Sequence, residues 1–471
     1  MPIESEQERI TVAIVGAGIA GLSLAVALNA LDHDHKIAID IYESTPELSE
    51  IGAGINIWPR TWCICEKVGL GESLAPLFDH PPNLEPRIIY EIRKADHADG
   101  FRVMDISKNG GGLRIHRADF QQCLIDNLPL PRNPNVKINS TCTLNLSHRL
   151  IDYTYRPSSA GHEKRPVTLQ FADRPSRSCD ILVGADGIKS TIRQLFLNRL
   201  ANGLDYQRFL QPRWAATVAY RALIDKEALR TLSPNHRILD HPGIMYVGRH
   251  KHAVAYSISG GKYINLVATT HDRSKEGTIW KGPWSSEVPK EELIEQFRGW
   301  DPEFQQLIQC VERPTRWALH DMHPLDTFAE ERVLLMGDAA HVMLPFQGAG
   351  AGCGIEDAYI LANLLTNRLV PSSPTPQQFS KVLDIYNRIR VPAAGAKVKA
   401  TVTQGELYTL AIPELEGYEE GDDIPKDKLL DVFRAAADNW SWTSSDPEED
   451  RRVAIDLLQG SLGMRSPQIY N

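Results

Sequence analysis

The chain has 471 residues, of which 42% are hydrophobic and 24% are charged, as in ordinary globular proteins. This length favours two domains, or one domain with large insertions. The net charge of −9 argues against a nucleic-acid-binding protein, which usually carries a basic surface.

The cysteines, the histidines and the N-terminus limit the class of protein further. The seven cysteines are scattered and odd in number, so we expect no disulfide framework, and Cys63 and Cys65 lack companions at zinc-ligand spacing. His320, His323 and His341 are too loosely spaced for a metal site, and we expect none. The N-terminus lacks an apolar signal region and no run of about 18 apolar residues occurs, so we expect a cytoplasmic protein without a membrane span.

The first predicted elements are a strand, a glycine turn and a helix. Residues 10–15 are apolar and lead into Gly16-Ala17-Gly18-Ile19-Ala20-Gly21, a G-x-G-x-x-G pattern. A second strand, residues 36–42, ends at Glu43, about 20 residues beyond the last glycine. This context predicts that the pyrophosphate of an ADP-containing cofactor lies at the helix N-terminus and that Glu43 binds a ribose. The alternative is a glycine-rich turn followed by a surface glutamate.

A second glycine loop and a basic junction follow. Residues 49–59 form a glycine loop that continues into apolar residues, and residues 113–120 predict the end of a strand and the start of a helix. Arg117 lies at that junction, where a surface ion pair and a cofactor contact are equally compatible with the residues alone. Residues 150–178 are polar and contain prolines, which predicts a variable surface hairpin.

Two strands place an aspartate beside a glycine at their carboxyl ends. Residues 180–183 predict a strand, followed by the turn Ala185-Asp186-Gly187 and a helix that begins at Ser190. Residues 333–336 predict another buried strand, followed by Gly337-Asp338. Open α/β sheets hold their ligands at the carboxyl ends of strands, so both carboxylates are candidate ligand contacts.

A glycine-rich segment follows the second of these turns. Four glycines alternate with small residues between positions 348 and 354, so backbone N–H groups can closely approach a flat or anionic partner. Apolar residues at helical spacing follow from Ile355, and a helix N-terminus behind such a loop stabilises negative charge. A flavin, with its sugar-like chain and a ring that becomes anionic, would suit this arrangement. The alternative is a tight turn between a core strand and a core helix.

Residues 212–312 have a different pattern. Short strand-like runs joined by tight turns indicate an antiparallel sheet inserted into the α/β domain, where we expect it to cover the cofactor. The runs are residues 215–224, 243–248, 252–259 and 263–270, with one turn at 259–261. Alternation along the first run puts Ala219 and Arg221 on one face and Tyr220 on the other. A charged Arg221 in an apolar strand needs a carboxylate partner or a ligand.

Helical patterns dominate the remainder. They cover residues 291–300, 304–310, a long stretch from residue 377 onward in which Pro392 marks a boundary, and 422–442.

Taken together, these segments resemble the FAD-dependent aromatic hydroxylases, which are single-component flavoprotein monooxygenases, and look most like the salicylate-hydroxylase type. The resemblance covers about residues 10–395 and rests on VAIVGAGIAGLSLAVAL, Glu43, EIGAGI, HRADF, DILVGADGIKSTIR and VLLMGDAAHVMLPFQGAGAGCGIEDA. It implies an α/β fold with a Rossmann-type FAD-binding domain, an inserted and mainly antiparallel β-sheet substrate domain, and C-terminal helices. The implied boundaries are 1–80, 110–200 and 315–395 for the first, 81–109 and 201–314 for the second, and 396–471 for the third.

The resemblance also implies which residues contact FAD. Those expected at the pyrophosphate and the adenosine ribose are Gly16, Gly18 and Gly21, and Glu43. Those expected near the flavin and its chain are Gly54, Arg117, Asp186, Asp338 (at the ribityl hydroxyls), Pro345 (against the isoalloxazine ring), and Gly350 and Ala351 (at the N1 edge of the ring). Asp186, with Gly187, matches a motif linked in the family to both FAD and nicotinamide use.

The activity implied is that of a monooxygenase that consumes NADH or NADPH together with O₂. The nicotinamide reduces the flavin, O₂ then forms a flavin C4a-hydroperoxide, and an electron-rich ring attacks its distal oxygen. The product is a hydroxylated small phenolic or amino-aromatic acid, with or without decarboxylation. Arg221 would pair a substrate carboxylate or phenolate, as an arginine does in several fungal relatives, and Tyr256, or else Tyr246, would bind or ionise the phenol. A structural ion pair for Arg221, and ordinary packing for the tyrosines, are the alternatives.

The chain departs from the salicylate-type pattern in one strand. Ala216 and Thr217 stand where some relatives have a histidine, which leaves the substrate and any side-chain base open. The alternative functions are a monooxygenase or flavin-dependent reductase for a larger secondary metabolite, and a flavoprotein module without turnover. We expect a small aromatic substrate and O₂ as partners, no nucleic acid or membrane, and a monomer or homodimer.

Overall fold

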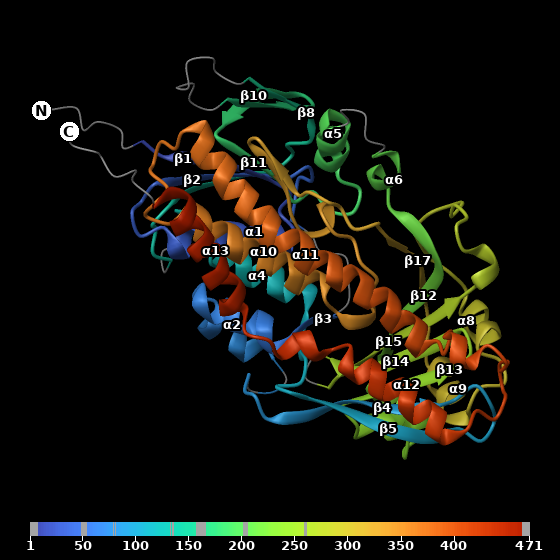
Figure 1. The fold of residues 1–471 in the computed structure, drawn as a ribbon. Helices are drawn as coiled ribbons and strands as arrows, with labels where there is room; N and C mark the ends of the chain where they lie inside the picture. Colours follow the sequence, from blue (N-terminus) through green and yellow to red (C-terminus); the bar gives the residue numbers. More distant parts are fainter. Residues whose placement is uncertain are drawn as a thin grey trace, which may run out of the picture.

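A computed structural model of the chain describes residues 8–48, 54–78, 80, 82–131, 133, 136–156, 166–200, 206–258 and 261–463. Two large β-sheets, with helices packed around them, make up most of this structure (Figure 1). Residues 49–53 of the predicted second glycine loop, and residues 259–260 of one predicted turn, lie outside the described residues.

The first sheet has six strands, and all but one edge strand run parallel. In spatial order they are β18 (Ala329–Glu330), β19 (Val333–Leu335), β11 (Ile181–Gly184), β1 (Ile10–Val15), β2 (Ile37–Tyr42) and β7 (Thr141–Asn145). Every residue of β1 is buried, because helices cover both faces of the sheet. The strands predicted at residues 10–15, 36–42, 180–183 and 333–336 are therefore confirmed to within one residue.

The helices around this sheet come from both ends of the chain. α1 (Ile19–Leu31) packs against α4 (Arg117–Asp126) and α10 (Gly350–Leu365), and α10 in turn packs against α11 (Pro376–Tyr408) and α13 (Pro447–Leu462). Beside α5 (Thr191–Leu200) lies a three-stranded antiparallel sheet of β8 (Leu150–Tyr155), β9 (Val167–Phe171) and β10 (Arg174–Cys179). None of the helices in the described residues combines the length and apolar character that crossing a membrane requires.

The second sheet has eight strands and is mainly antiparallel, with one parallel pair between β4 and β13. In spatial order they are β16 (Ser285–Glu287), β17 (Thr315–Asp321), β12 (Arg213–Asp225), β15 (Tyr263–His271), β14 (Lys251–Ile258), β13 (Gly243–Gly248), β4 (Pro86–Lys94) and β5 (Phe101–Asn109). One face packs on the short helices α7 (Lys226–Leu232), α8 (Lys290–Gln296) and α9 (Pro302–Gln309). The predicted inserted sheet is confirmed.

A short ribbon and several small helices connect these parts. The ribbon pairs β3 (Gly54–Ile57) with β6 (Leu113–His116). The remaining helices are α2 (Pro59–Lys67), α3 (Gly71–Leu74), α6 (Gln207–Leu210) and α12 (Lys426–Asp438), and the 3₁₀ turns are η1 (Ala75–Leu77), η2 (Arg237–Leu239), η3 (Arg273–Lys275), η4 (Gly337–Ala339), η5 (Pro345–Gln347), η6 (Pro413–Leu415) and η7 (Ser441–Ser444).

The prediction that Pro392 marks a helix boundary is wrong. α11 continues through it from Pro376 to Tyr408 and connects the region of the parallel sheet with that of the second sheet (Figure 1). Pro392 removes the hydrogen bond to the carbonyl of Arg388, but both residues are exposed, so water can satisfy that carbonyl. Residue 395, the predicted end of the FAD-binding part, lies inside this helix. The division into domains stays a prediction.

Candidate active site

Four neighbouring strands of the parallel sheet end at the same edge. The register pairs Val15 with both Tyr42 and Gly184, and Gly184 with Leu335. The residues that follow these strand ends are Glu43, Gly16, Asp186 and Asp338, all four of which were candidates from the sequence. The edge is therefore the place where the open α/β architecture holds a ligand.

The three glycines of the turn between β1 and α1 differ in what surrounds them. A Cβ on Gly16 would lie 2.2 Å from the carbonyl oxygen of Ala185, and one on Gly21 would lie 2.1 Å from the carbonyl oxygen of Gly16. These two glycines are required by backbone packing. A Cβ on Gly18 would meet no described atom within 4 Å. The space beside the N-terminus of α1, whose first turn has no side-chain cap, is thus open to an anionic ligand.

Glu43 faces this turn as an ionised carboxylate. Its Oε2 accepts a hydrogen bond from the backbone N–H of Ala17 at 3.0 Å, and its Oε1 accepts one from that of Thr45 at 2.9 Å. Burial acts to raise the pKa of Glu43, but these hydrogen bonds outweigh burial and hold the pKa below its ordinary value. A carboxylate in this position can accept hydrogen bonds from ribose hydroxyls.

Asp186 has a structural task in the described fold. Its Oδ2 accepts hydrogen bonds from the backbone N–H groups of Thr191 at 2.8 Å and Ile192 at 3.1 Å, which caps α5, and its Oδ1 accepts one from Ser190 Oγ at 2.5 Å. Burial raises the pKa of Asp186 above its ordinary value in spite of these hydrogen bonds. A contact between Asp186 and a cofactor stays a prediction.

Asp338 is exposed on the turn after β19, and Arg193 supports that turn from inside. The Nη1 of Arg193 donates to the carbonyl oxygens of Asp338 and Ala339, both at 3.2 Å. A Cβ on Gly350 would lie 4.0 Å from Asp338 Oδ1, so the carboxylate faces the first turn of α10. Arg193 belongs to the motif DILVGADGIKSTIR, but its role was not predicted, because only the folded chain brings its guanidinium under residues 338–339.

A group of buried charged side chains, which we call the buried ion network, lies beneath the same turn. It consists of Arg60, His341, Glu356, Asp357, Arg390 and Lys397, each no more than 8% exposed. Asp357 Oδ2 accepts from the backbone N–H of Gly337 at 2.9 Å and lies 2.6 Å from His341 Nε2, while Oδ1 accepts from Arg390 Nε at 2.7 Å. Asp357 thereby fixes the position of Gly337, and with it the turn that carries Asp338.

Opposite charges in this network shift one another's pKa values. Burial would raise the pKa of Glu356, but Lys397, Arg390 and Arg60 outweigh it and hold the pKa far below its ordinary value. Their atoms lie 2.5, 3.0 and 3.1 Å from the carboxylate. Burial would likewise lower the pKa of His341, but Cys353 and Asp357 raise it above its ordinary value. The His341–Asp357 pair is therefore ionic.

The glycine-rich segment becomes helical earlier than its apolar residues indicated. α10 begins at Gly350, whereas the helical spacing was recognised only from Ile355. Gly352 and Gly354 lie inside the helix because side chains would collide there: a Cβ would lie 2.6 Å from Thr61 Oγ1 and 2.9 Å from the Cβ of Ala20, respectively. Close packing thus explains part of the glycine pattern, as the alternative interpretation proposed.

The N-terminus of α10 is nevertheless open to a ligand. Its first turn contains no acidic residue and no side-chain cap, so its N–H groups and dipole face outward. Pro345 is exposed, and Gly350 and Ala351 are half-buried. The three residues that the resemblance assigns to the flavin ring are accessible on one short segment.

The β3–β6 ribbon connects this edge with the second sheet. A Cβ on Gly54 would lie 3.8 Å from the hydroxyl of Tyr256. Arg117 is the first residue of α4, and its charge acts to lower the pKa of Arg221, so the two cations lie within electrostatic reach of each other. The ribbon thus brings the predicted cofactor and substrate residues to one place.

Arg221 and Tyr256 lie on the face of the second sheet that faces the loop before α10. Ala219, two residues before Arg221, packs with Leu344 of that loop, and the Arg221 guanidinium lies 5.0 Å from the ring centre of Trp317. Burial lowers the pKa of Arg221, although Tyr256 raises it. Within the described part of the chain Arg221 pairs with no carboxylate, and its buried Nε has no hydrogen-bond partner.

Two other tyrosines lie on the opposite face of this sheet. The Tyr246 hydroxyl donates to Glu303 Oε1 at 3.2 Å, and the Tyr220 hydroxyl donates to Glu292 Oε1 at 2.8 Å. Both rings pack with the short helices behind the sheet. Tyr220 points away from Arg221 as predicted, and Tyr246 does not face the candidate site.

The strand that carries Arg221 is irregular near its start. Trp214 pairs with His320 and Val218 with Ala318, so extra residues bulge out between them, and Ala216 has a φ of +51°. The Thr217 hydroxyl lies 3.0 Å from His271 Nδ1 and donates to the carbonyl oxygen of Ala215 at 2.8 Å. These bonds hold the Thr217 hydroxyl within the sheet.

Arg114 is a site residue that the sequence did not single out. Its guanidinium lies 4.5 Å from the ring centre of Tyr256 and donates to the carbonyl oxygens of Pro242 at 2.5 Å and Ile89 at 3.2 Å. The available signal was its alternation with Ile115 in a short strand beside Arg117, which predicts an arginine on the face toward a neighbouring sheet.

The residues present fit FAD. The space at Gly18 can take a pyrophosphate, the ionised Glu43 can take ribose hydroxyls, and Asp338 stands beside a helix N-terminus that favours a negative ring.

Several known proteins are similar to this chain over nearly its whole length. A family model described as "FAD binding domain" matches residues 279–401. Salicylate hydroxylase of Pseudomonas putida is 32% identical over 448 residues, which cover 93% of either chain. 6-Methylsalicylate 1-monooxygenase of Aspergillus terreus is 28% identical over 96% of this chain and 92% of its own. A solved salicylate hydroxylase substrate complex is 31% identical, with a TM-score of 0.77 over 95% of this chain and 98% of that one.

Proposed function

The chain belongs to the FAD-dependent aromatic hydroxylases, and we propose that it uses NADH or NADPH with O₂ to hydroxylate a small phenolic or amino-aromatic acid. FAD is its cofactor, and an aromatic compound and O₂ are its substrates. The proposed acid agrees with the names of two relatives, salicylate hydroxylase and 6-methylsalicylate 1-monooxygenase.

The choice of an acid as the substrate rests on the surroundings of Arg221. A half-buried guanidinium without a carboxylate partner among the described residues is unfavourable unless a ligand supplies the anion. Its planar donors match a carboxylate or phenolate, and Trp317 offers an aromatic surface beside it.

We assign the remaining contacts as the resemblance implies. Gly18 and the N-terminus of α1 would hold the pyrophosphate of FAD, Glu43 the adenosine ribose and Asp338 the ribityl hydroxyls. Gly54, Arg117, Asp186, Pro345, Gly350 and Ala351 would surround the flavin and its chain. Bound there, FAD would supply the redox chemistry: it accepts a hydride from the nicotinamide and activates O₂ for transfer of one oxygen atom to the ring.

The chain's own residues orient the substrate and exclude water. Arg221 would hold the acidic group, and the apolar side chains of Ala219, Leu344 and Phe346 would limit the access of water to the reacting ring. Burial raises the pKa of Tyr256 above its ordinary value, although Arg114 and Arg221 act to lower it. Its phenol therefore stays protonated at neutral pH, and Tyr256 would donate a hydrogen bond to the substrate rather than remove a proton.

The test is nicotinamide oxidation by the purified yellow protein with a panel of hydroxy- and aminobenzoates, with hydrogen peroxide and product mass recorded. We expect a benzoate to stimulate oxidation and to gain one oxygen, or to exchange its carboxylate for one. Stimulation without oxygen in the product would favour the reductase, and no stimulation by any benzoate would point to a larger substrate.

Replacing Arg221 tests the assignment of the acidic group. Arg221→Lys loses the planar pair of donors, so we expect the KM for the acid to rise about tenfold while the FAD content stays unchanged. Arg316→Lys is the matched control, because Arg316 lies on the adjacent strand β17 but pairs with Glu292 on the opposite face. Equal KM values of the two variants for the acid would show that Arg221 has only a structural role.

A further inference from the structure

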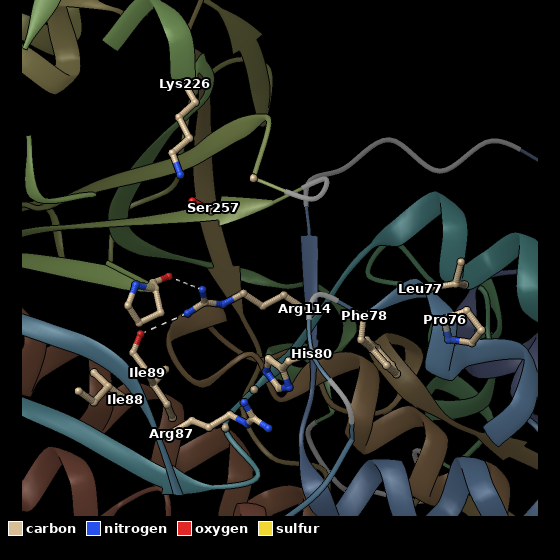
Figure 2. Close-up of a pocket in the computed structure, with 14 residues that line it drawn as sticks. Pro76, Leu77, Phe78, His80, Arg87, Ile88, Ile89, Arg114, Lys226 and Ser257 are labelled. Atoms are coloured by element: carbon tan, nitrogen blue, oxygen red, sulfur yellow. Dashed lines mark hydrogen bonds between the residues drawn. The ribbon is translucent and has the colours of Figure 1, made fainter. Parts of the chain in front are cut away.

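A pocket of about 920 Å³ lies where the β3–β6 ribbon, the η1 turn and the second sheet meet (Figure 2). Apolar walls come from Leu77 and Phe78 on one side and from Ile88 and Ile89 on the other. Ligand pockets commonly measure about 300–1,000 Å³, so this one suits a ligand much larger than a single benzoate ring.

The charged side chains that line this pocket are all basic. Arg87, Arg114 and Lys226 contribute cations, His80 adds an imidazole, and no carboxylate lines the pocket within the described ranges. Figure 2 shows Lys226 and Arg87 on either side of Arg114. Concave surfaces of one charge attract ligands of the opposite charge.

Two of these cations are available to a ligand. Among the residues the structure describes, Lys226 Nζ forms no hydrogen bond or ion pair. Arg87 Nη2 contacts Asn83 Oδ1 at 2.9 Å and the exposed Glu85 at 3.6 Å, while its buried Nε has no partner in the described chain. A buried, unsatisfied guanidinium N–H is costly, so a ligand that accepts from it is favoured.

The pocket adjoins the candidate active site. Arg114 lines the pocket and also lies 4.5 Å from the ring centre of Tyr256. Ser257, the next residue along β14, lines the pocket as well. Tyr256 in turn lies beside Gly54, so the pocket is close to a residue that the resemblance assigns to the flavin.

We propose that this pocket binds the phosphates of NADH or NADPH while the nicotinamide ring reaches the flavin. This assignment rests on the proposed function. The chain has one G-x-G-x-x-G fingerprint, which FAD occupies, so the second dinucleotide needs another anion site. The proposed aromatic acid carries only one anionic group, and Arg221 already serves as its partner. A dinucleotide carries a pyrophosphate, which matches several dispersed cations. In the step served, the C4–H bond of the dihydronicotinamide breaks, its hydrogen leaves with both electrons for FAD, and the oxidised dinucleotide departs.

The test is to mix the FAD-loaded enzyme rapidly with NADH or NADPH without oxygen and to record the reduction of FAD. For Lys226→Ala and for Arg87→Ala we expect the Kd of NADH or NADPH to rise about tenfold, because each loses a charge-assisted hydrogen bond to phosphate. The phosphate-free donor 1-benzyl-1,4-dihydronicotinamide should reduce both variants at the wild-type rate. Arg87→Lys should recover part of the affinity.

The matched control is Lys290→Ala. Lys290 is the first residue of α8, as Lys226 is of the equally long α7, but it lies outside this pocket. Unchanged Kd values in both pocket variants would overturn the proposal, as would an equal slowing with the phosphate-free donor. A wild-type enzyme that neither NADH nor NADPH reduces, although the phosphate-free donor does, would instead contradict the proposed nicotinamide use itself, and the pocket's ligand with it.

Discussion

The two sheets build the site in different ways. At the edge of the parallel sheet, backbone contacts define the site: Gly16 and Gly21 pack against carbonyl groups, and the buried ion network holds Gly337 in place. On the second sheet, the side chains of Arg221 and Tyr256 define it, and Arg221 has no carboxylate partner among the described residues. Backbone packing thus suits the first region to one cofactor. In the second region, single side-chain substitutions can change which ligand binds.

The largest expected effect comes from breaking the buried ion network. Glu356→Gln keeps the shape of the side chain but leaves the charge of Lys397 buried without its carboxylate, so we expect a loss of about 3–5 kcal/mol in the free energy of unfolding. Denaturant titration of the purified protein measures it. The exposed Glu414→Gln is the control and should stay within about 0.5 kcal/mol of wild type. An equally small change in Glu356→Gln would contradict a network that stabilises the turn.

The same network predicts how stability depends on pH. The pKa values of Glu356 and Asp357 are lowered in the folded chain, so their contribution is present above the unfolded values, near 4.5 and 3.8, and is lost as the pH falls through the folded values. We expect the melting temperature of the wild type to fall below about pH 4.5, and to fall less steeply in Glu356→Gln. Parallel curves for the two proteins would show that other carboxylates control acid unfolding.

Two alanine substitutions separate backbone packing from ligand contact in the first glycine turn. Gly16→Ala introduces a collision at a φ of +110° and should destabilise the fold by about 1–3 kcal/mol. Gly18→Ala meets open space, so its stability should match the wild type while the Kd for FAD rises about tenfold. Thermal unfolding of the apoprotein and FAD titration measure the two effects. Unchanged FAD affinity in Gly18→Ala would show that the pyrophosphate does not lie at this position.

At the second turn, we expect an effect on FAD binding alone. Asp338→Ala removes an exposed acceptor that faces Gly350, so FAD binding should weaken about tenfold without a change in apoprotein stability. Asp338→Asn, which retains one oxygen acceptor, should bind FAD with intermediate affinity. Full FAD content in Asp338→Ala after dialysis would count against a ribityl contact.

The smallest effect is expected on the second sheet. Tyr256→Phe removes one hydroxyl and keeps the ring beneath Arg114, so we expect the KM for the aromatic substrate to rise about fivefold, with normal FAD content. Tyr220→Phe is the control, because its hydroxyl bonds to Glu292 behind the sheet. The measurement compares the KM values of the two variants. Equal values would show that Tyr256 only packs within the sheet.

The contrast between the regions also explains what the sequence could predict. Gly16, Gly18 and Glu43 were recognisable because strand, turn and acid follow one another at fixed spacing, so local pattern determines their positions. The position of Asp338, just beyond the end of a buried strand, was predictable for the same reason. The prediction failed at Pro392, where local chemistry indicates a boundary, but water can satisfy the exposed carbonyl that loses its hydrogen bond, which lowers the penalty.

The remaining parts of the site depend on contacts between distant segments. The partners Arg60, Glu356 and Arg390 come from three separate helices, and nothing in their local sequence indicates that they meet. Arg114 is a similar case, because its place over Tyr256 depends on how the ribbon packs against the second sheet. The substrate could not be predicted further, because it is determined by such contacts rather than by a motif.

The most direct test of the central claim is the mass of the product formed from a stimulating benzoate under ¹⁸O₂, with NADH or NADPH as the reductant. A hydroxylase of this family must transfer one atom of O₂ to the ring, so we predict a product that carries a single ¹⁸O. A product without the label, or nicotinamide oxidation that yields only hydrogen peroxide with every aromatic acid, would contradict the account.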